Sequence, residues 1–107
     1  MILQINFNLN VPVSEYEALS ESVAQAFADV PGLRWKVWLL NAAAQEAGGI
    51  YLFDSEASID AFLEGPLGAK LRTLTAIRNV SIKRFDVMPE VTALTRGPVE
   101  IAAMTSS

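Results

Sequence analysis

The side chains that could do chemistry in this chain are few, because the sequence contains no histidine and no cysteine. Their absence excludes a thiol nucleophile, a zinc finger, a disulfide scaffold, a histidine general base and a haem held by either residue type. Proton transfer is left to Asp, Glu, Lys, Arg and Tyr. With no carboxylate cluster at metal-ligand spacing, we expect no metal, and the lack of histidine excludes a Ser-His-Asp triad. We assign no catalytic residue.

Aromatic and basic side chains are the first candidates for a binding site. Trp35, Trp38 and Tyr51 offer flat apolar surfaces that suit a flat ligand. Trp35 also fits plain core packing, and Trp38 fits a dimer interface as well as a pocket. Arg34 and Lys36 are the only cations among the first 69 residues. Either they hold a phenolate or stabilise developing negative charge, or they belong to a solvated strand face or pair with acids across a dimer.

A row of amides near the N-terminus is the second candidate. Gln4, Asn6 and Asn8 alternate with apolar residues, so they share one face of a strand. They either orient the oxygen atoms of a ligand or form a solvent-facing or inter-subunit hydrogen-bonded row. The predicted substrate-binding residues are therefore Trp38, Tyr51, Asn6, Asn8, Lys36 and Trp35.

Hydrophobic periodicity predicts the elements that position these residues. Strands are expected at Leu3–Leu9, Leu33–Asn41, Gly48–Phe53 and Val80–Val87. A helix begins at Ser14, where Glu17 completes a capping box, and it ends at Pro31-Gly32. A second helix, capped by Asp54 or Ser55, is interrupted at Gly65-Pro66 and resumes as a short turn over 67–74. The tail after residue 90 is weakly patterned and carries at most one more strand or helix.

The resulting order, βαββαβ, predicts an α+β ferredoxin-like fold with an antiparallel sheet and helices on one face. We expect a single domain over residues 1–90 and a C-terminal extension over 91–107 that packs on a dimer partner. The sheet face without helices needs a cover in a chain that is 51% hydrophobic. A second copy related by a two-fold axis would supply it, so we expect a homodimer.

The charge balance limits the partners of this chain. Its formal net charge of −4 predicts repulsion from nucleic acid and from anionic membranes. No run approaches the roughly 18 apolar residues of a membrane helix. The N-terminal residues lack the features of a secretory signal, so a cytoplasmic location is expected.

Two motifs carry a family resemblance. They are Pro31-Gly32-Leu33-Arg34-Trp35-Lys36-Val37-Trp38 and Glu46-Ala47-Gly48-Gly49-Ile50-Tyr51-Leu52-Phe53. Together with Phe85-Asp86-Val87, they make the chain similar to the YdhR-like family, whose members are named monooxygenases by inference from their relatives. The resemblance covers residues 1–90.

This resemblance implies a dimeric α/β barrel of the group that includes antibiotic-biosynthesis monooxygenases. Those relatives oxidise polycyclic phenols or quinols with molecular oxygen and need neither metal nor flavin. The implied function is therefore cofactor-independent oxidation of a small aromatic, phenolic or quinol-like compound. The alternative is a non-catalytic dimer of the same fold that binds an aromatic metabolite. Haem degradation, known in the same group, is opposed by the lack of histidine, and a purely structural dimer remains the simplest alternative.

Overall fold

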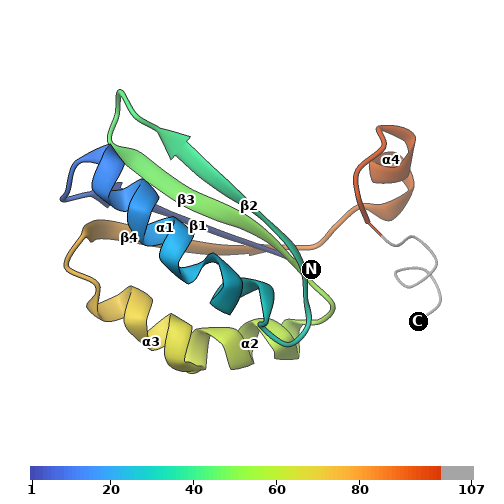
Figure 1. The fold of residues 1–107 in the computed structure, drawn as a ribbon. Helices are drawn as coiled ribbons and strands as arrows, with labels where there is room; N and C mark the ends of the chain where they lie inside the picture. The colour runs from blue at the N-terminus through green and yellow to red at the C-terminus, as the bar shows by residue number, and fades with distance from the viewer. Residues whose placement is uncertain (100–107) are drawn as a thin grey trace.

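The computed structural model describes residues 1–99, in which four antiparallel strands form one sheet in the order β2-β3-β1-β4 (Figure 1). This arrangement confirms the predicted α+β, ferredoxin-like fold. The elements in chain order are β1 (Ile2–Leu9), α1 (Val13–Ala28), β2 (Leu33–Asn41), β3 (Glu46–Phe53), α2 (Glu56–Glu64), α3 (Pro66–Thr73), β4 (Ile77–Phe85) and α4 (Pro89–Leu94).

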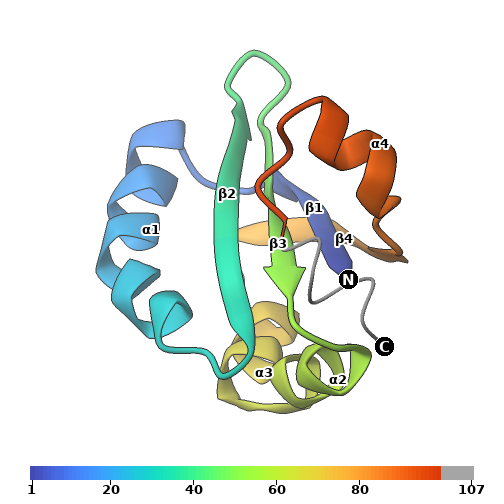
Figure 2. The same ribbon diagram turned by 90° about the vertical axis from the view of Figure 1, so that its right-hand side faces the viewer.

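Strand β1 lies inside the sheet and pairs with β3 on one side and β4 on the other. Its apolar residues are buried on the face toward α1, α2 and α3, and its amides lie on the opposite face, here called the open face. Figure 2 shows α1 and α4 on opposite sides of the sheet. The strict alternation seen in the sequence therefore divides the core from the open face, as predicted. The buried residues of β1 are Leu3, Ile5, Phe7 and Leu9.

The β2–β3 hairpin continues this division. Lys36 is paired with Tyr51 and Trp38 with Gly49, so these side chains lie on the helix face of the sheet. The intervening Val37 lies on the open face and is 49% exposed. Both strands occur where they were predicted, although β3 starts two residues earlier, at Glu46.

The start of α1 differs from the prediction. The helix begins at Val13 with Pro12 as its N-cap, and no side chain caps it, so the predicted Ser14–Glu17 capping box is wrong. The carbonyl oxygen of Pro12 accepts hydrogen bonds from the backbone N–H groups of Glu15 and Tyr16. Proline at this position has the fixed φ of −58°, which lets the chain enter the helix one residue earlier.

The last strand also differs. β4 spans Ile77–Phe85, three residues earlier at its start than predicted, and excludes Val87. Asn10 Nδ2 donates to the carbonyl oxygen of Ile77 at 3.2 Å, and Leu9 pairs with Ile77. These contacts with β1 fix where β4 begins, and they join residues far apart in the chain. After β4, the predicted tail element is the short helix α4, which begins with a proline at its first position.

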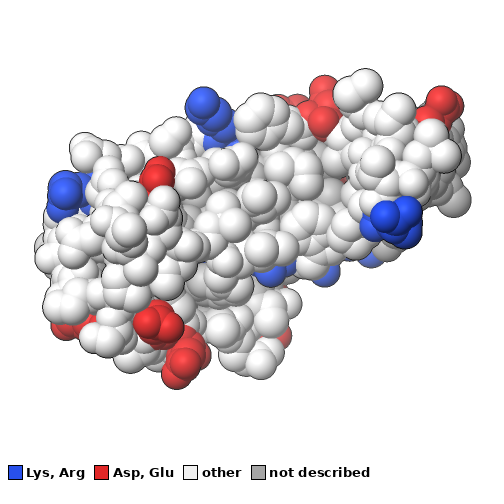
Figure 3. All heavy atoms as spheres, turned by 90° about the horizontal axis from the view of Figure 1, so that it is seen from above, with Lys and Arg blue, Asp and Glu red and all other residues white. Residues whose placement is uncertain are grey.

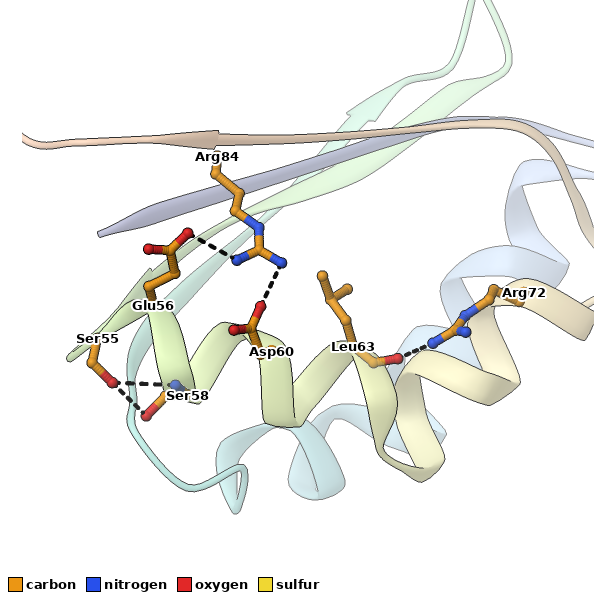
Figure 4. Close-up of polar contacts among 7 residues, drawn as sticks. All are labelled: Ser55, Glu56, Ser58, Asp60, Leu63, Arg72 and Arg84. Atoms are coloured by element: carbon orange, nitrogen blue, oxygen red, sulfur yellow. Dashed lines mark hydrogen bonds and ion pairs between the residues drawn. The ribbon is translucent and has the colours of Figure 1, made fainter.

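An ion-paired arginine joins the edge strand β4 to helix α2 (Figure 4). Arg84 lies 2.7 Å from an Asp60 carboxylate oxygen and 3.4 Å from one of Glu56. Ser55, one of the two predicted candidates, is the N-cap of α2 and accepts a hydrogen bond from the Ser58 backbone N–H at 3.2 Å. These contacts hold α2 against the face of the sheet that the helices cover. They also assign two of the acidic side chains near this helix start to ion pairing.

The charged side chains on the face shown in Figure 3 do not form one large patch. Viewed from above, Lys, Arg, Asp and Glu side chains form separate groups on a largely uncharged surface (Figure 3). Within residues 1–99, the helices are too short or too polar to cross a bilayer.

The two adjacent glycines of β3 provide a test of how closely β3 packs against β1 and β2. A Cβ on Gly48 would lie 2.0 Å from the Ile5 backbone oxygen, whereas one on Gly49 would meet the flexible Lys36 side chain at 2.8 Å. We expect Gly48→Ala to lower the free energy of unfolding by more than about 2 kcal/mol, since a backbone atom in a paired strand has no room to move. Gly49→Ala should cost less. Urea unfolding of the two variants measures the difference, and equal losses would contradict this packing.

Candidate functional site

A hollow of about 60 Å³ lies between the helix face of the sheet and helices α1 and α3. Aromatic rings come to it from β1, α1, β2 and β3, and leucines come from α3. Its polar groups are few and include no carboxylate among residues 1–99. The lining includes Phe7, Tyr16, Ser20, Phe27, Lys36, Trp38, Tyr51, Leu67, Lys70, Leu71 and Leu74.

The Lys36 ammonium lies among three of these rings. Its Nζ is 3.3 Å from the centroid of the Trp38 ring, 3.6 Å from that of Phe27 and 4.7 Å from that of Tyr51. Phe27 and Trp38 meet edge to face, with centroids 5.3 Å apart. We call these three rings and the ammonium the Lys36 cage. A cation over ring faces is stabilised by the ring quadrupoles.

Local sequence explains how β2 and β3 build the cage. Lys36 and Trp38 are two residues apart in a strand, so both side chains lie on the same face. The β2–β3 register then places Tyr51 opposite Lys36. Gly49, opposite Trp38, has no side chain, and a Cβ there would crowd both Lys36 Cε and Tyr51 Cε1. The glycine therefore provides the space that the lysine chain occupies.

Helix α1 supplies the third ring, and sequence reasoning did not assign it to the site. Phe27 follows Val23 at helical spacing, which places both on one apolar face of the helix. That spacing predicts which way Phe27 points, but not that it meets β2. Helix α1 has no fully buried residue, so it lies over the sheet without sealing the space beneath it.

Burial changes the proton affinity of the groups in the hollow. It lowers the pKa of Lys36 to about 7, because the charged ammonium loses hydration. The ring contacts act in the opposite direction, since they favour the ammonium. Burial also raises the pKa values of Tyr51 and Tyr16, so both phenols stay neutral at physiological pH. Lys36 is thus the group here that titrates near neutrality.

The predicted site residues fall on two faces of the sheet. Lys36, Trp38 and Tyr51 come together in the Lys36 cage. The structure therefore does not match the alternative of a solvated strand face for Lys36. The remaining three, Trp35, Asn6 and Asn8, are on the open face.

The open-face residues have partners of their own. Trp35 Nε1 donates to the carbonyl oxygen of Pro98 at 2.9 Å. Asn6 Oδ1 accepts from Gln4 Nε2 at 2.9 Å, and Asn8 Oδ1 accepts from Asn79 Nδ2 at 3.2 Å. The amides thus form two hydrogen-bonded pairs, and the sheet separates them from the cage.

A second hollow, of about 230 Å³, lies between α1 and β2. It shares three lining residues with the first: Phe27, Lys36 and Trp38. These side chains therefore stand between the two hollows. Lys36 is the longest and most flexible of them.

Comparison with protein families gives a match over nearly the whole chain. Residues 2–98 match the family described as "Putative mono-oxygenase ydhR". The chain belongs to this family. The resemblance noted from the two central motifs is confirmed, and the match extends beyond the predicted domain end at residue 90.

Solved structures with the same fold include three proteins of different description. NE2512 from Nitrosomonas europaea, of unknown function, is 14% identical over 81% of this chain and 87% of its own, with a TM-score of 0.69. SnoaB, a cofactor-independent oxygenase from Streptomyces nogalater, is 17% identical over 83% and 96%, with a TM-score of 0.64. MhuD, a heme-degrader from Mycobacterium tuberculosis, is 19% identical over 82% and 96%, with a TM-score of 0.64.

No curated protein matches the chain. At these identities the solved structures establish the fold alone, and one fold carries different activities in them. Function therefore has to be argued from the chain's own site.

The buried ammonium makes a testable contribution to stability. The pKa of Lys36 is about 7 in the folded chain, whereas the ordinary pKa of a lysine is 10.5, so from about pH 7 to 10 the unfolded chain binds more protons. The free energy of unfolding should rise with pH there, by at most about 1.4 kcal/mol per pH unit. Lys36→Met should remove this rise and be more stable than the wild type near neutral pH.

Urea unfolding at several pH values measures the effect, with Lys83→Met as the charge-matched control on β4. Above about pH 10 the raised pKa values of Tyr16 and Tyr51 lower stability instead, so the comparison stops there. Equal slopes in the wild type and Lys36→Met would show that Lys36 keeps an ordinary pKa.

Proposed function

We propose that the protein is a cofactor-independent monooxygenase that oxidises a small aromatic, phenolic or quinol-like substrate with molecular oxygen. The observation that carries the proposal is the Lys36 cage, in which a cation lies among aromatic rings inside an apolar hollow. Membership of a family described as monooxygenases supports the same class of reaction.

This reaction requires few functional groups from the protein. An ionised electron-rich phenol can itself reduce oxygen, so the site needs to bind the ring, favour the anion and exclude water. Trp38, Tyr51 and Phe27 would contact the ring, and Lys36 would face its oxygen. For oxidation of a CH₂ group to a carbonyl, one oxygen atom enters the product and the other leaves as water. The substrate supplies all four electrons, so no further reductant is needed.

We further propose that two chains pair through their open faces, with residues 91–99 packed on the partner; the rest of the predicted extension, 100–107, lies outside the described residues. Support comes from apolar side chains exposed on or beside that face. Val37 is 49% exposed, Phe85 is 47% exposed and Met88 is 70% exposed. A second copy would remove them from water, and the amide row of Asn6 and Asn8 would then lie at the interface.

The alternative function is a non-catalytic dimer that binds an aromatic metabolite. The small hollow of about 60 Å³ favours it, because an apolar cavity of about 150 Å³ holds one benzene, and a substrate together with oxygen needs still more room. A ligand therefore enters only when side chains withdraw. Haem is a poorer fit still, since the hollow is too small and the sequence has no histidine or cysteine.

Oxygen consumption tests the proposed activity. Chelator-treated protein is incubated with anthrones, hydroquinones and naphthols, with correction for autoxidation. We expect uptake that scales with protein and turns over on at least one compound, because the site supplies the anion and the substrate supplies the electrons. Binding without uptake would favour the non-catalytic alternative, and light scattering on the same preparation tests the pairing of two chains.

Two tryptophan variants test which sheet face holds the ligand. Trp38→Ala should weaken binding of an aromatic compound about 3- to 10-fold, the size of a lost ring–ring contact, with a small change in melting temperature. Trp35→Ala removes an indole from the open face; because Trp35 lines the second hollow but not the first, this variant should weaken binding less. Calorimetric titration measures both. A larger effect of Trp35→Ala, or Trp38→Ala that melts earlier but binds normally, would move the ligand out of the Lys36 cage.

A further inference from the structure

The Lys36 ammonium differs from other cations of the chain in its surroundings. Arg84 pairs with two carboxylates, and Arg78 donates to the Leu9 carbonyl oxygen and the Asn10 side chain. Lys36 Nζ has ring faces as neighbours, and within residues 1–99 it has neither a carboxylate partner nor a hydrogen bond. A partly buried charge without a counter-ion is costly. The site is therefore suited to a ligand that brings a negative charge.

The other polar groups of the hollow do not supply that charge. Tyr16 and Ser20 come from α1, Tyr51 from β3 and Lys70 from α3. The two phenols are kept neutral by burial, Ser20 is a neutral hydroxyl, and Lys70 is a second cation. Although the chain carries 12 acidic residues, those among residues 1–99 lie outside this lining. Both cations favour an anion, and the rings favour a flat one.

We propose that Lys36 accepts the proton of a bound phenol and holds the ligand as a phenolate paired with its ammonium. This rests on the proposed function for the location of the ligand, and it names both the substrate class, ionisable phenols, and the residue that takes the proton. The O–H bond of the phenol breaks, the proton forms an N–H bond on the neutral amine, and the electron pair stays on the phenolate oxygen. No other reactant is needed. A pKa of about 7 means that a large share of Lys36 is the neutral amine at physiological pH. In the bound pair each charge favours the other, so the phenolate raises the pKa of the ammonium and the ammonium lowers that of the phenol, which offsets the proton's ordinary preference for the phenol oxygen.

The two hollows show how the ligand would fit. Both are lined by Lys36, Phe27 and Trp38, and their volumes are about 60 and 230 Å³. Withdrawal of the Lys36 chain from between the rings would join them and free the ring faces for a ligand. The amine would then lie at the edge of the ligand, where a phenolic oxygen is found. Gly49 places no side chain in the way of this movement.

The test uses β-naphthol, whose ionised form absorbs at longer wavelength than its neutral form. At about pH 8 the free naphthol is neutral, as phenols ionise near pH 10. We expect the wild type to give a saturable naphtholate band. Calorimetry in two buffers of different ionisation enthalpy should detect no net proton release, because the proton moves to Lys36.

Two variants at this position separate proton acceptance from charge alone. Lys36→Met should reduce the bound naphtholate at least tenfold. Lys36→Arg keeps the charge but cannot accept a proton, so any naphtholate it binds must release about one proton to the buffer. Lys83→Met, a charge-matched control outside the lining, should behave like the wild type. Circular dichroism checks that each variant is folded.

Failure of this inference is distinguishable from failure of the proposed function. Naphtholate formation that depends on Lys36, without oxygen uptake on any compound, would support the inference and count against the monooxygenase. Oxygen uptake by a protein that binds naphthol only in its neutral form, or does not bind it, would overturn the inference and leave the monooxygenase. An undiminished naphtholate band in Lys36→Met, or proton release by the wild type, would also overturn it.

Discussion

The two-sided pairing of β1 is the constraint on which the other features of the structure depend. Its apolar residues must face the helices and its amides must face away, and a slip of one residue would exchange the two sets. Because β3 pairs with β1 in a fixed register, Gly48 lies against the Ile5 backbone oxygen and Tyr51 lies opposite Leu3. The hairpin then fixes Lys36 beside Tyr51. The site is thus a consequence of strand register rather than of a loop.

Burying the Lys36 ammonium in the hollow lowers the stability of the folded chain. Burial lowers the pKa of Lys36, so the folded chain loses free energy to keep this side chain charged near neutral pH. An apolar residue of similar length would fill the same space more favourably. Residues that lower the stability of the fold are often found where a site needs a reactive group. Here such a residue lies in an aromatic hollow. Lys36 combines a loss of stability with a place in the aromatic hollow, so it is a better candidate for a functional residue than the arginines that have polar partners.

The family and the fold limit the class of function, but they do not determine the substrate or the reaction. The family match covers residues 2–98 and carries a monooxygenase description. The solved structures share the fold with SnoaB and MhuD at identities of 17% and 19%, and those two proteins differ in chemistry. The proposed oxidation of a phenol rests on the cage of one cation and three rings. The open face, with its exposed apolar side chains and its amides, is a separate surface, and we propose that it pairs two chains.

The sequence by itself determined the antiparallel sheet, the element order and the sharing of one face by Lys36 and Trp38, because alternation along a strand is a local property. It also indicated the family, and it limited the cap of the second helix to Asp54 or Ser55. It did not determine the entry to α1, the start of β4 or the separation of Asn6 and Asn8 from the cage. Those depend on the Pro12 carbonyl, on the pairing of Leu9 with Ile77 and on which sheet face the helices cover. Only the tertiary structure brought Phe27 to Lys36, since a helix and a strand meet through packing that no local pattern specifies.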